Sequence, residues 1–501
     1  MELCNASYSL LQLKKYDEML STSERALEID PTYADAWCKK GVALDELKRY
    51  EEAIACYDHA LGINPNDAKA WNNKGNALAE LKRYEEAFAC FDHALEIDPN
   101  DAVAWYNKGR PLDNLKRYEE AIACDDRALA IDANYAHAWG NKGRVLSELK
   151  RYEEAITCFD RALAIDPNYT YAWNLKGNAL RGLTRYDEVI ACYDRTLNID
   201  PGYAYAWNNK GITLDKLKRY EEALTCCDRA LEINPTFALA WFNKGLVLDD
   251  LRRCEEAIGY YDRALGIDAN DAMTWNNKGA SLDKLKRYEE AMKCYDRALG
   301  INPDYAKAWG NKGRALSGLK RYEKANACCD GALEIDPFDA DALWNKSFAL
   351  SGLKRYEEAI ACYDRALEIN PDDAIAWNNK GDALHMLKRY EEAIACCDRA
   401  LEINSDDADP WINKGGALFI LGRSKEAIAC YDRALEIDRN RTSAWNSKGL
   451  ALDELGRYEE AIACYDRALE INPKSELARE KRNAAQQMCN QLKAAKKPTN
   501  P

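Results

Sequence analysis

Tryptophan recurs in this chain every thirty-four residues, and no other feature limits the possible folds as strongly. The register is kept by Trp37, Trp71, Trp105, Trp139, Trp173, Trp207, Trp241, Trp275, Trp309, Trp377, Trp411 and Trp445. The thirteenth tryptophan, Trp344, stands one place late. A repeat of this length is typical of stacked supersecondary units, each of which buries its apolar face only against a neighbour. The sequence therefore predicts one array of repeats instead of several globular domains.

Each repeat contains two helical segments, as the copy at residues 68–101 illustrates. With the tryptophan at position four of the frame, Trp71 and Gly75 fall on the first helix, and Ala87 and Phe91 share the apolar stripe of the second. Pro99 ends the second helix. Both segments are amphipathic, so the repeat is expected to fold as a helical hairpin.

These residues resemble the tetratricopeptide repeat, a helix-turn-helix unit of thirty-four residues. The matching positions in this copy are Trp71, Gly75, Tyr84, Ala87, Phe91, Ala94 and Pro99, while Leu78 stands where an aromatic residue is more usual. The resemblance implies an all-α fold, an α-α superhelix in which the repeats form a right-handed solenoid.

The frame divides the chain into four parts. They are a degraded first copy at 1–33, thirteen tandem repeats at 34–475, a capping helix at 476–493 and a disordered tail at 494–501. In the capping helix we expect Leu477, Ala484, Met488 and Leu492 to face the last repeat. Whether the chain is complete at its N-terminus stays open.

Two stretches depart from the repeat pattern. In the copy at 102–135, Pro111 falls inside the first helix and Asp125 replaces the core aromatic residue. Near residue 344, Leu343 takes the position of the tryptophan. Because a solenoid is held together by coupling between neighbours, we expect the copy at 102–135 to be its weakest point, either as a functional hinge or through drift.

Composition narrows the location and the partners. The charged fraction is 31% and the net charge is −14, which suit an exposed helical array and disfavour nucleic acid as a partner. No apolar run approaches the ~18 residues of a membrane span. We expect a cytoplasmic protein without membrane contact.

Most cysteines recur at one frame position. They are Cys56, Cys90, Cys124, Cys158, Cys192, Cys226, Cys294, Cys328, Cys362, Cys396, Cys430 and Cys464. Helix axes pack roughly 8–10 Å apart, farther than the ~7 Å limit between the α-carbons of a disulfide. The sequence therefore predicts small core residues and no metal site.

The chain lacks the motifs of common enzymes. It has no phosphate-binding glycine loop, no HExxH, no CxxC and no nucleophile elbow. We expect no catalytic residue, no cofactor and no enzymatic activity.

One face of every first helix varies between copies. Positions one, two, five, nine, twelve and thirteen change freely, and at ~100° per residue they fall within an arc of roughly 120°. In the family that the chain resembles, this face lines the concave groove that holds peptides. The sequence therefore favours a protein-interaction scaffold that binds an extended peptide or a partner segment. The alternatives are a structural spacer or self-assembling rod, and the repeat part of a larger enzyme.

Two sets of residues are the candidate binding residues. Position six carries Asn73, Asn107, Asn141, Asn209, Asn243, Asn277, Asn311, Asn345, Asn379 and Asn413, a row of amides that can pair with a peptide backbone. The row is similar to the asparagine ladder of O-linked N-acetylglucosamine transferases, whose catalytic part is absent here. An apolar patch of Tyr205, Ile212, Leu239, Phe242, Leu246 and Met273 would supply specificity.

Every full copy carries lysine at position seven and aspartate at position twenty-five. These positions lie level in an antiparallel hairpin, so Lys74 and Asp92 are expected to pair inside one repeat. By the same symmetry, Gly75 is expected to pack against Phe91. That contact would explain a glycine that costs ~1 kcal/mol in helix propensity.

Overall fold

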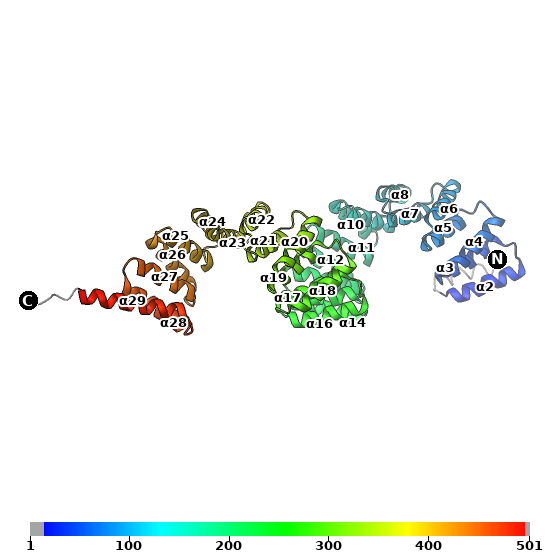
Figure 1. The fold of residues 1–501 in the computed structure, drawn as a ribbon. Helices are drawn as coiled ribbons and strands as arrows, with labels where there is room; N and C mark the ends of the chain where they lie inside the picture. Colours follow the sequence, from blue (N-terminus) through cyan, green and yellow to red (C-terminus); the bar gives the residue numbers. More distant parts are fainter. Residues whose placement is uncertain (1–14, 496–501) are drawn as a thin grey trace, which may run out of the picture. The chain divides into compact units, whose positions relative to one another are not determined.

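The structure, a computed structural model, describes residues 15–495 of the chain. The first half of the degraded copy and residues 496–501 of the expected tail lie outside the described residues. Within them, all regular secondary structure is helical, which confirms the all-α prediction (Figure 1). None of the helices in this part of the chain has the length and apolar character of a membrane-spanning segment.

The helices alternate between first and second members of a repeat. The first part of the chain holds α2 (Tyr16–Ile29), α3 (Ala34–Glu46), α4 (Tyr50–Ile63), α5 (Ala68–Glu80), α6 (Tyr84–Ile97), α7 (Ala102–Asn114), α8 (Tyr118–Ile131), α9 (Ala136–Glu148), α10 (Tyr152–Ile165), α11 (Thr170–Gly182), α12 (Tyr186–Ile199), α13 (Ala204–Lys216), α14 (Tyr220–Ile233) and α15 (Ala238–Asp250). The second part holds α16 (Cys254–Ile267), α17 (Ala272–Lys284), α18 (Tyr288–Ile301), α19 (Ala306–Gly318), α20 (Tyr322–Ile335), α21 (Ala340–Gly352), α22 (Tyr356–Ile369), α23 (Ala374–Met386), α24 (Tyr390–Ile403), α25 (Ala408–Ile420), α26 (Ser424–Ile437), α27 (Thr442–Glu454), α28 (Tyr458–Ile471) and α29 (Glu476–Ala495).

The chain divides into two compact units, at residues 1–247 and 248–501, with the division inside α15. Within each unit, a first helix packs on the second helix of its repeat, and that second helix packs on the next first helix. Each unit is therefore a stack of helical hairpins.

A left-handed residue turns the chain between the two helices of a repeat. Lys82 has a φ of 61°, and the amide of Arg83 donates a hydrogen bond of 2.9 Å to the carbonyl of Leu78. A lysine in this conformation costs on the order of 1 kcal/mol. Gly422 and Gly456 hold the same position in their copies with φ of 75° and 72°.

The core of each repeat rests on close packing between its two helices, as predicted. A Cβ atom added to Gly75 would lie 2.7 Å from Cε1 of Phe91, whose ring is completely buried. The glycine is therefore needed for the aromatic ring to reach the first helix. Trp71 connects neighbouring repeats, because its indole Nε1 donates to the carbonyl of Pro65 at 2.9 Å.

The predicted ion pair within a repeat is wrong. Lys74 pairs with Asp58 of the preceding repeat at 2.6 Å, and Asp92 pairs with Lys108 of the following repeat at 2.5 Å. The lysine lies on the side of the first helix that faces the previous second helix. The same pairing recurs along both units and ends at Arg482 of α29, which bonds Asp466 at 2.5 Å. Each pair is partly exposed and contributes under ~1 kcal/mol, but all of them couple neighbours.

The predicted contact face of the capping helix is also wrong. In α29 the residues Leu477, Met488 and Leu492 are 43–46% exposed and Ala484 is exposed. Ala478 and Ala485 are buried instead. They stand at frame positions three and ten, which are buried in complete repeats too. The helix therefore packs as the first helix of one more repeat.

The recurrent cysteines are buried free thiols, as predicted for small core residues. Burial raises the pKa of Cys90 to about 11, so this thiol stays protonated and unreactive at neutral pH.

Hydrogen exchange should be faster in residues 102–135 than in residues 204–237 of the same unit. Helix α7 continues through Pro111, but a proline inside a helix lacks the N–H of a backbone hydrogen bond and costs about 3 kcal/mol. Exchange mass spectrometry of the whole chain measures this difference. Equal rates in the two copies would contradict a weak point at Pro111.

Candidate functional site

The asparagine row at position six takes part in contacts between repeats. The amide nitrogen of Asn107 donates to Oδ1 of Asn72, at position five of the preceding repeat, over 3.1 Å. The same bond joins Asn209 to Asn174, Asn243 to Asn208, Asn311 to Asn276, and Asn413 to Asn378. These amides thus tie the scaffold together, and a role in peptide binding stays a prediction.

The row is only partly accessible. Asn107, Asn141, Asn243 and Asn345 are buried, whereas Asn73, Asn209, Asn277, Asn311, Asn379 and Asn413 are half-buried. In some copies without an amide at the preceding position five, another acceptor replaces it. Asn345 donates to the carbonyl of Gly310, and Asn277 donates to that of Met273 in its own helix.

The predicted apolar patch is smaller than expected. In the first unit, the side chain of Tyr205 is 57% exposed and that of Leu239 is 43% exposed. Ile212 and Leu246, on the same two first helices, are half-buried. Phe242 is only 5% exposed, so its assignment to an exposed patch is wrong. Phe242 stands at position five of the frame, and the side chain at this position packs between neighbouring repeats although its residue type varies. Met273 is exposed but belongs to the second unit.

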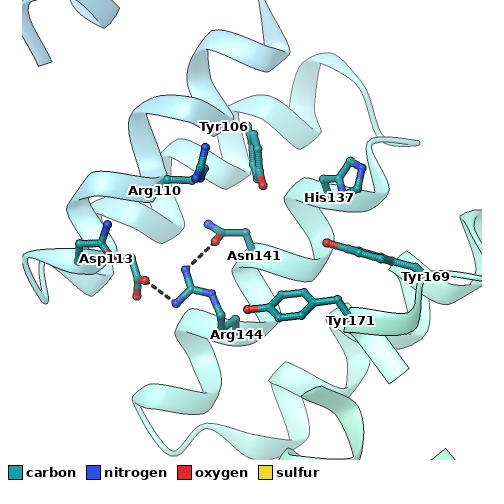
Figure 2. A pocket seen from close by; sticks show the side chains of 9 residues that line it. Tyr106, Arg110, Asp113, His137, Asn141, Arg144, Tyr169 and Tyr171 are labelled. Atoms are coloured by element: carbon teal, nitrogen blue, oxygen red, sulfur yellow. Dashed lines mark hydrogen bonds and ion pairs between the residues drawn. The ribbon is translucent and has the colours of Figure 1, made fainter. Parts of the chain in front are cut away.

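A cavity of about 350 Å³ opens on the first helices α7, α9 and α11 of the first unit (Figure 2). Its lining consists of Tyr106, Arg110, Asp113, Asn114, His137, Asn141, Arg144, Tyr169 and Tyr171. Apart from Asn141 and Tyr169, these residues stand at the variable frame positions two, five, nine, twelve and thirteen. The face that varies between repeats thus forms a hollow here.

Two arginines give the cavity its charge. The guanidinium of Arg144 forms an ion pair with Asp113, whose side chain is 7% exposed, and donates a hydrogen bond to Oδ1 of Asn141 over 2.8 Å (Figure 2). Arg110 meets Glu80 of the preceding repeat at 3.3 Å, with both side chains 47% exposed. The first arginine is therefore fixed by buried partners, and the second is held weakly.

A buried carboxyl group lies beneath this hollow. Asp125 of α8 is completely buried, and its Oδ2 accepts a hydrogen bond from the amide nitrogen of Asn141 over 2.7 Å. Its other oxygen has no hydrogen-bond partner among the described residues. Burial raises the pKa of Asp125 to about 8, so the carboxyl group is protonated at neutral pH. Asp125 also orients Asn141, which leaves the amide oxygen free to accept from Arg144.

Aromatic side chains form the remaining walls. The rings of Tyr106 and Tyr135 meet edge to face at 5.2 Å, and those of His137 and Tyr169 do so at 4.9 Å. Burial raises the pKa of the Tyr106 and Tyr169 hydroxyl groups. Tyr171 is 41% exposed and stands at the mouth. The hydroxyl groups of Tyr106 and Tyr169 are therefore neutral donors at physiological pH.

Sequence reasoning found one residue of this cavity, Asn141, and missed the rest. A signal was present, because Tyr106, Arg110, Arg144 and Tyr171 are bulky residues at the variable positions of successive copies. Asp125 was interpreted as the loss of a core aromatic residue. The structure shows instead that it begins a hydrogen-bonded chain toward the surface.

The second unit has a cavity of about 500 Å³ between α19 and α21, where the tryptophan register slips. Leu343 fills the usual tryptophan site and is completely buried, so that Trp344 moves to the cavity wall and stacks on Phe348 with ring centroids 5.8 Å apart. In regular copies the tryptophan donates a hydrogen bond to the carbonyl at the end of the preceding repeat. Here that carbonyl, of Pro337, accepts a hydrogen bond from the guanidinium of Arg365 at 2.9 Å.

The fold defines an α-solenoid repeat protein. Family profiles described as tetratricopeptide repeat match residues 34–67, 68–101, 136–169, 204–237, 272–305, 408–441 and 442–475. Further profiles with the same description match residues 3–33, 90–123, 170–203, 234–272, 306–339 and 349–408. The chain belongs to the tetratricopeptide repeat family.

The solved structures that are similar to the chain include the following two. The crystal structure of the APC/C hetero-tetramer Cut9–Hcn1 shares 16% identity over 89% of this chain and 95% of that chain, with a TM-score of 0.51. The crystal structure of YrrB, a TPR protein with an unusual peptide-binding site, shares 30% identity over 37% of this chain and 95% of that chain, with a TM-score of 0.31. No curated protein sequence matches the chain. The first likeness supports the fold, and the similarity to O-linked N-acetylglucosamine transferases stays a prediction.

Proposed function

We propose that the chain is a non-enzymatic protein-interaction scaffold that holds an extended peptide or partner segment against α7, α9 and α11. The observation that carries this proposal is the cavity of about 350 Å³ on those helices. Its volume falls within the range of roughly 300–1,000 Å³ that is common for ligand sites. Solenoid proteins use such extended surfaces to bind partners.

The chemistry of the lining also suits a peptide. The aromatic rings of Tyr106, Tyr169 and Tyr171 offer contact area, and their hydroxyl groups offer directed hydrogen bonds. Aromatic residues and arginine are the types most often found at the energetic centres of protein interfaces. A peptide side chain that enters this hollow would therefore find both apolar contact and polar partners.

A peptide selection tests the proposal. Peptides would be selected from a random library displayed on phage against the whole chain, and their affinities measured by fluorescence anisotropy. Tyr171→Ala removes a ring at the mouth of the cavity and is expected to weaken a selected peptide at least about tenfold, the equivalent of about 1.4 kcal/mol.

The matched control is Phe338→Ala, which removes a 75% exposed aromatic ring from the turn before α21. It should leave the affinity unchanged. A library that yields no binding peptide would contradict the proposal and favour a structural spacer. Selected peptides that are insensitive to Tyr171→Ala would place the binding site elsewhere.

A further inference from the structure

The cavity on α7, α9 and α11 contains more hydrogen-bond donors than acceptors. The hydroxyl groups of Tyr106, Tyr169 and Tyr171 form no hydrogen bond with another described residue, and Figure 2 shows them directed toward the space between the helices. The guanidinium groups of Arg110 and Arg144 add further N–H donors. The only carboxylate in the lining is that of Asp113.

The partners within the protein leave part of this donor set unused. Arg144 uses two of its nitrogens on Asp113 and Asn141, and its planar group carries five N–H donors in total. The pair of Arg110 with Glu80 is long and half exposed, so its exchange for another anion costs little. Both arginines are thus available to a bound anion.

The residues that line the cavity carry an excess of positive charge, although the whole chain carries −14. The lining contains two guanidinium groups and one carboxylate, and Glu80, which lies outside the lining, is the exposed partner that a bound anion would replace at Arg110. The carboxyl group of Asp125 beneath it adds little charge at neutral pH, because burial raises its pKa to about 8. A local positive field on an acidic protein selects for an anionic group of the partner.

We propose that this cavity binds the phosphoryl group of a phosphorylated residue in the partner peptide. The inference rests on the proposed function, because it assigns a chemical class to the peptide held there. A phosphoryl group has three acceptor oxygens and nearly two negative charges at neutral pH, whereas a carboxylate has two oxygens and one charge. Two arginines and three hydroxyl groups match the phosphoryl group better in the number of donors and in charge.

The aromatic walls of the cavity favour a phosphoryl group that is carried by a bulky side chain. The cavity volume of about 350 Å³ exceeds the space of a phosphoryl group alone, and His137 and Tyr169 form an aromatic wall. A probe that carries a phosphoryl group on a ring therefore represents the ligand well. Phenyl phosphate is such a probe, and benzoate provides the matched carboxylate.

Isothermal titration calorimetry of the whole chain tests this inference. Phenyl phosphate is expected to bind at least about tenfold more tightly than benzoate. Tyr171→Phe, which removes one hydroxyl group, and Arg110→Gln, which removes one partly exposed charge, should each weaken phenyl phosphate by about tenfold, since hydrogen bonds to charged groups are the stronger ones. Circular dichroism should show unchanged helicity in both variants.

Two matched controls lie outside the cavity. Tyr186→Phe at the start of α12 and Arg161→Gln on the exposed side of α10 remove the same groups and should leave the affinity for phenyl phosphate unchanged. Equal or tighter binding of benzoate would overturn the inference. So would phenyl phosphate binding that Tyr171→Phe and Arg110→Gln do not change.

The outcomes also separate this inference from the proposed function. If selected peptides bind and depend on Tyr171 while phenyl phosphate does not bind, the phosphoryl assignment is wrong and the peptide site stands. If neither peptides nor phenyl phosphate bind, both proposals fail.

Discussion

Replacing Gly279 with alanine is expected to destabilise its repeat by about 2 kcal/mol, because the added methyl group overpacks the core. A Cβ atom at this position would lie 2.6 Å from Cε1 of Tyr295, and that ring is completely buried. The ring cannot withdraw without opening the contact between α17 and α18. Hydrogen exchange in residues 272–301 measures the effect, which corresponds to an increase of roughly thirtyfold in the local opening equilibrium.

Gly259→Ala is the matched control for this change. Gly259 lies in the middle of α16 and is exposed, and a Cβ atom there would meet nothing within 4 Å. Alanine should therefore stabilise that helix by ~1 kcal/mol through its higher helix propensity. The same chemical substitution thus has opposite signs at two positions of one unit. Destabilisation of similar size at both positions would show that the close contact with Tyr295 does not decide the outcome.

The glycine contact could be predicted because it lies inside one repeating unit. The frame places positions eight and twenty-four level in a hairpin, and a glycine at the first leaves room for an aromatic ring at the second, as at Gly75 and Phe91. Helix bounds followed from the same periodicity, since the apolar stripe and the turn recur in every full copy and the terminating proline recurs in most of them. Local pattern and close packing agree here, which is the condition under which sequence reasoning succeeds.

The lysine pairing could not be predicted from the frame alone. Lys74 is level with an aspartate in its own repeat and also close to one in the preceding repeat, and only the direction of its side chain selects Asp58.

The packing of the capping helix could not be predicted from the apolar pattern either. Its large apolar residues form a regular stripe, but the packing follows small residues such as Ala478 and Ala485, because the last repeat offers a surface shaped for a first helix.

The cavity was missed for a different reason. Its residues come from three repeats, and each is unremarkable within its own copy. In sequence, Asp125 only replaces the core aromatic residue that other copies have at the same frame position, such as Tyr57 or Phe91. Only the bond from Asn141 to Asp125, and that from Arg144 to Asn141, shows that the substituted residue supports a surface group.

Asp125 makes the stability of the first unit depend on pH. Its pKa is about 8 in the folded chain and ordinarily about 3.8. Burial is the main cause, partly opposed by the hydrogen bond from Asn141 and by the charges of Arg144 and Lys142, while Asp126 acts in the same direction as burial. Because the folded state holds this proton more tightly, the stabilisation is complete below pH 4 and is lost as the pH rises through 8.

Asp125→Asn should remove this dependence. The substituted amide keeps an oxygen that accepts from Asn141 but carries no titrating group. The wild-type chain is expected to lose about 1.3 kcal/mol of unfolding free energy relative to the variant between pH 6 and pH 7, and about 1 kcal/mol between pH 7 and pH 8. Urea unfolding followed by circular dichroism at pH 6, 7 and 8 measures the difference between the two chains, in which all other titrating groups cancel. Parallel pH profiles would mean that Asp125 is already ionised at pH 6 in the folded protein. The carboxyl group would then place a negative charge beneath the two arginines, and the positive field that we assign to the cavity would be lost.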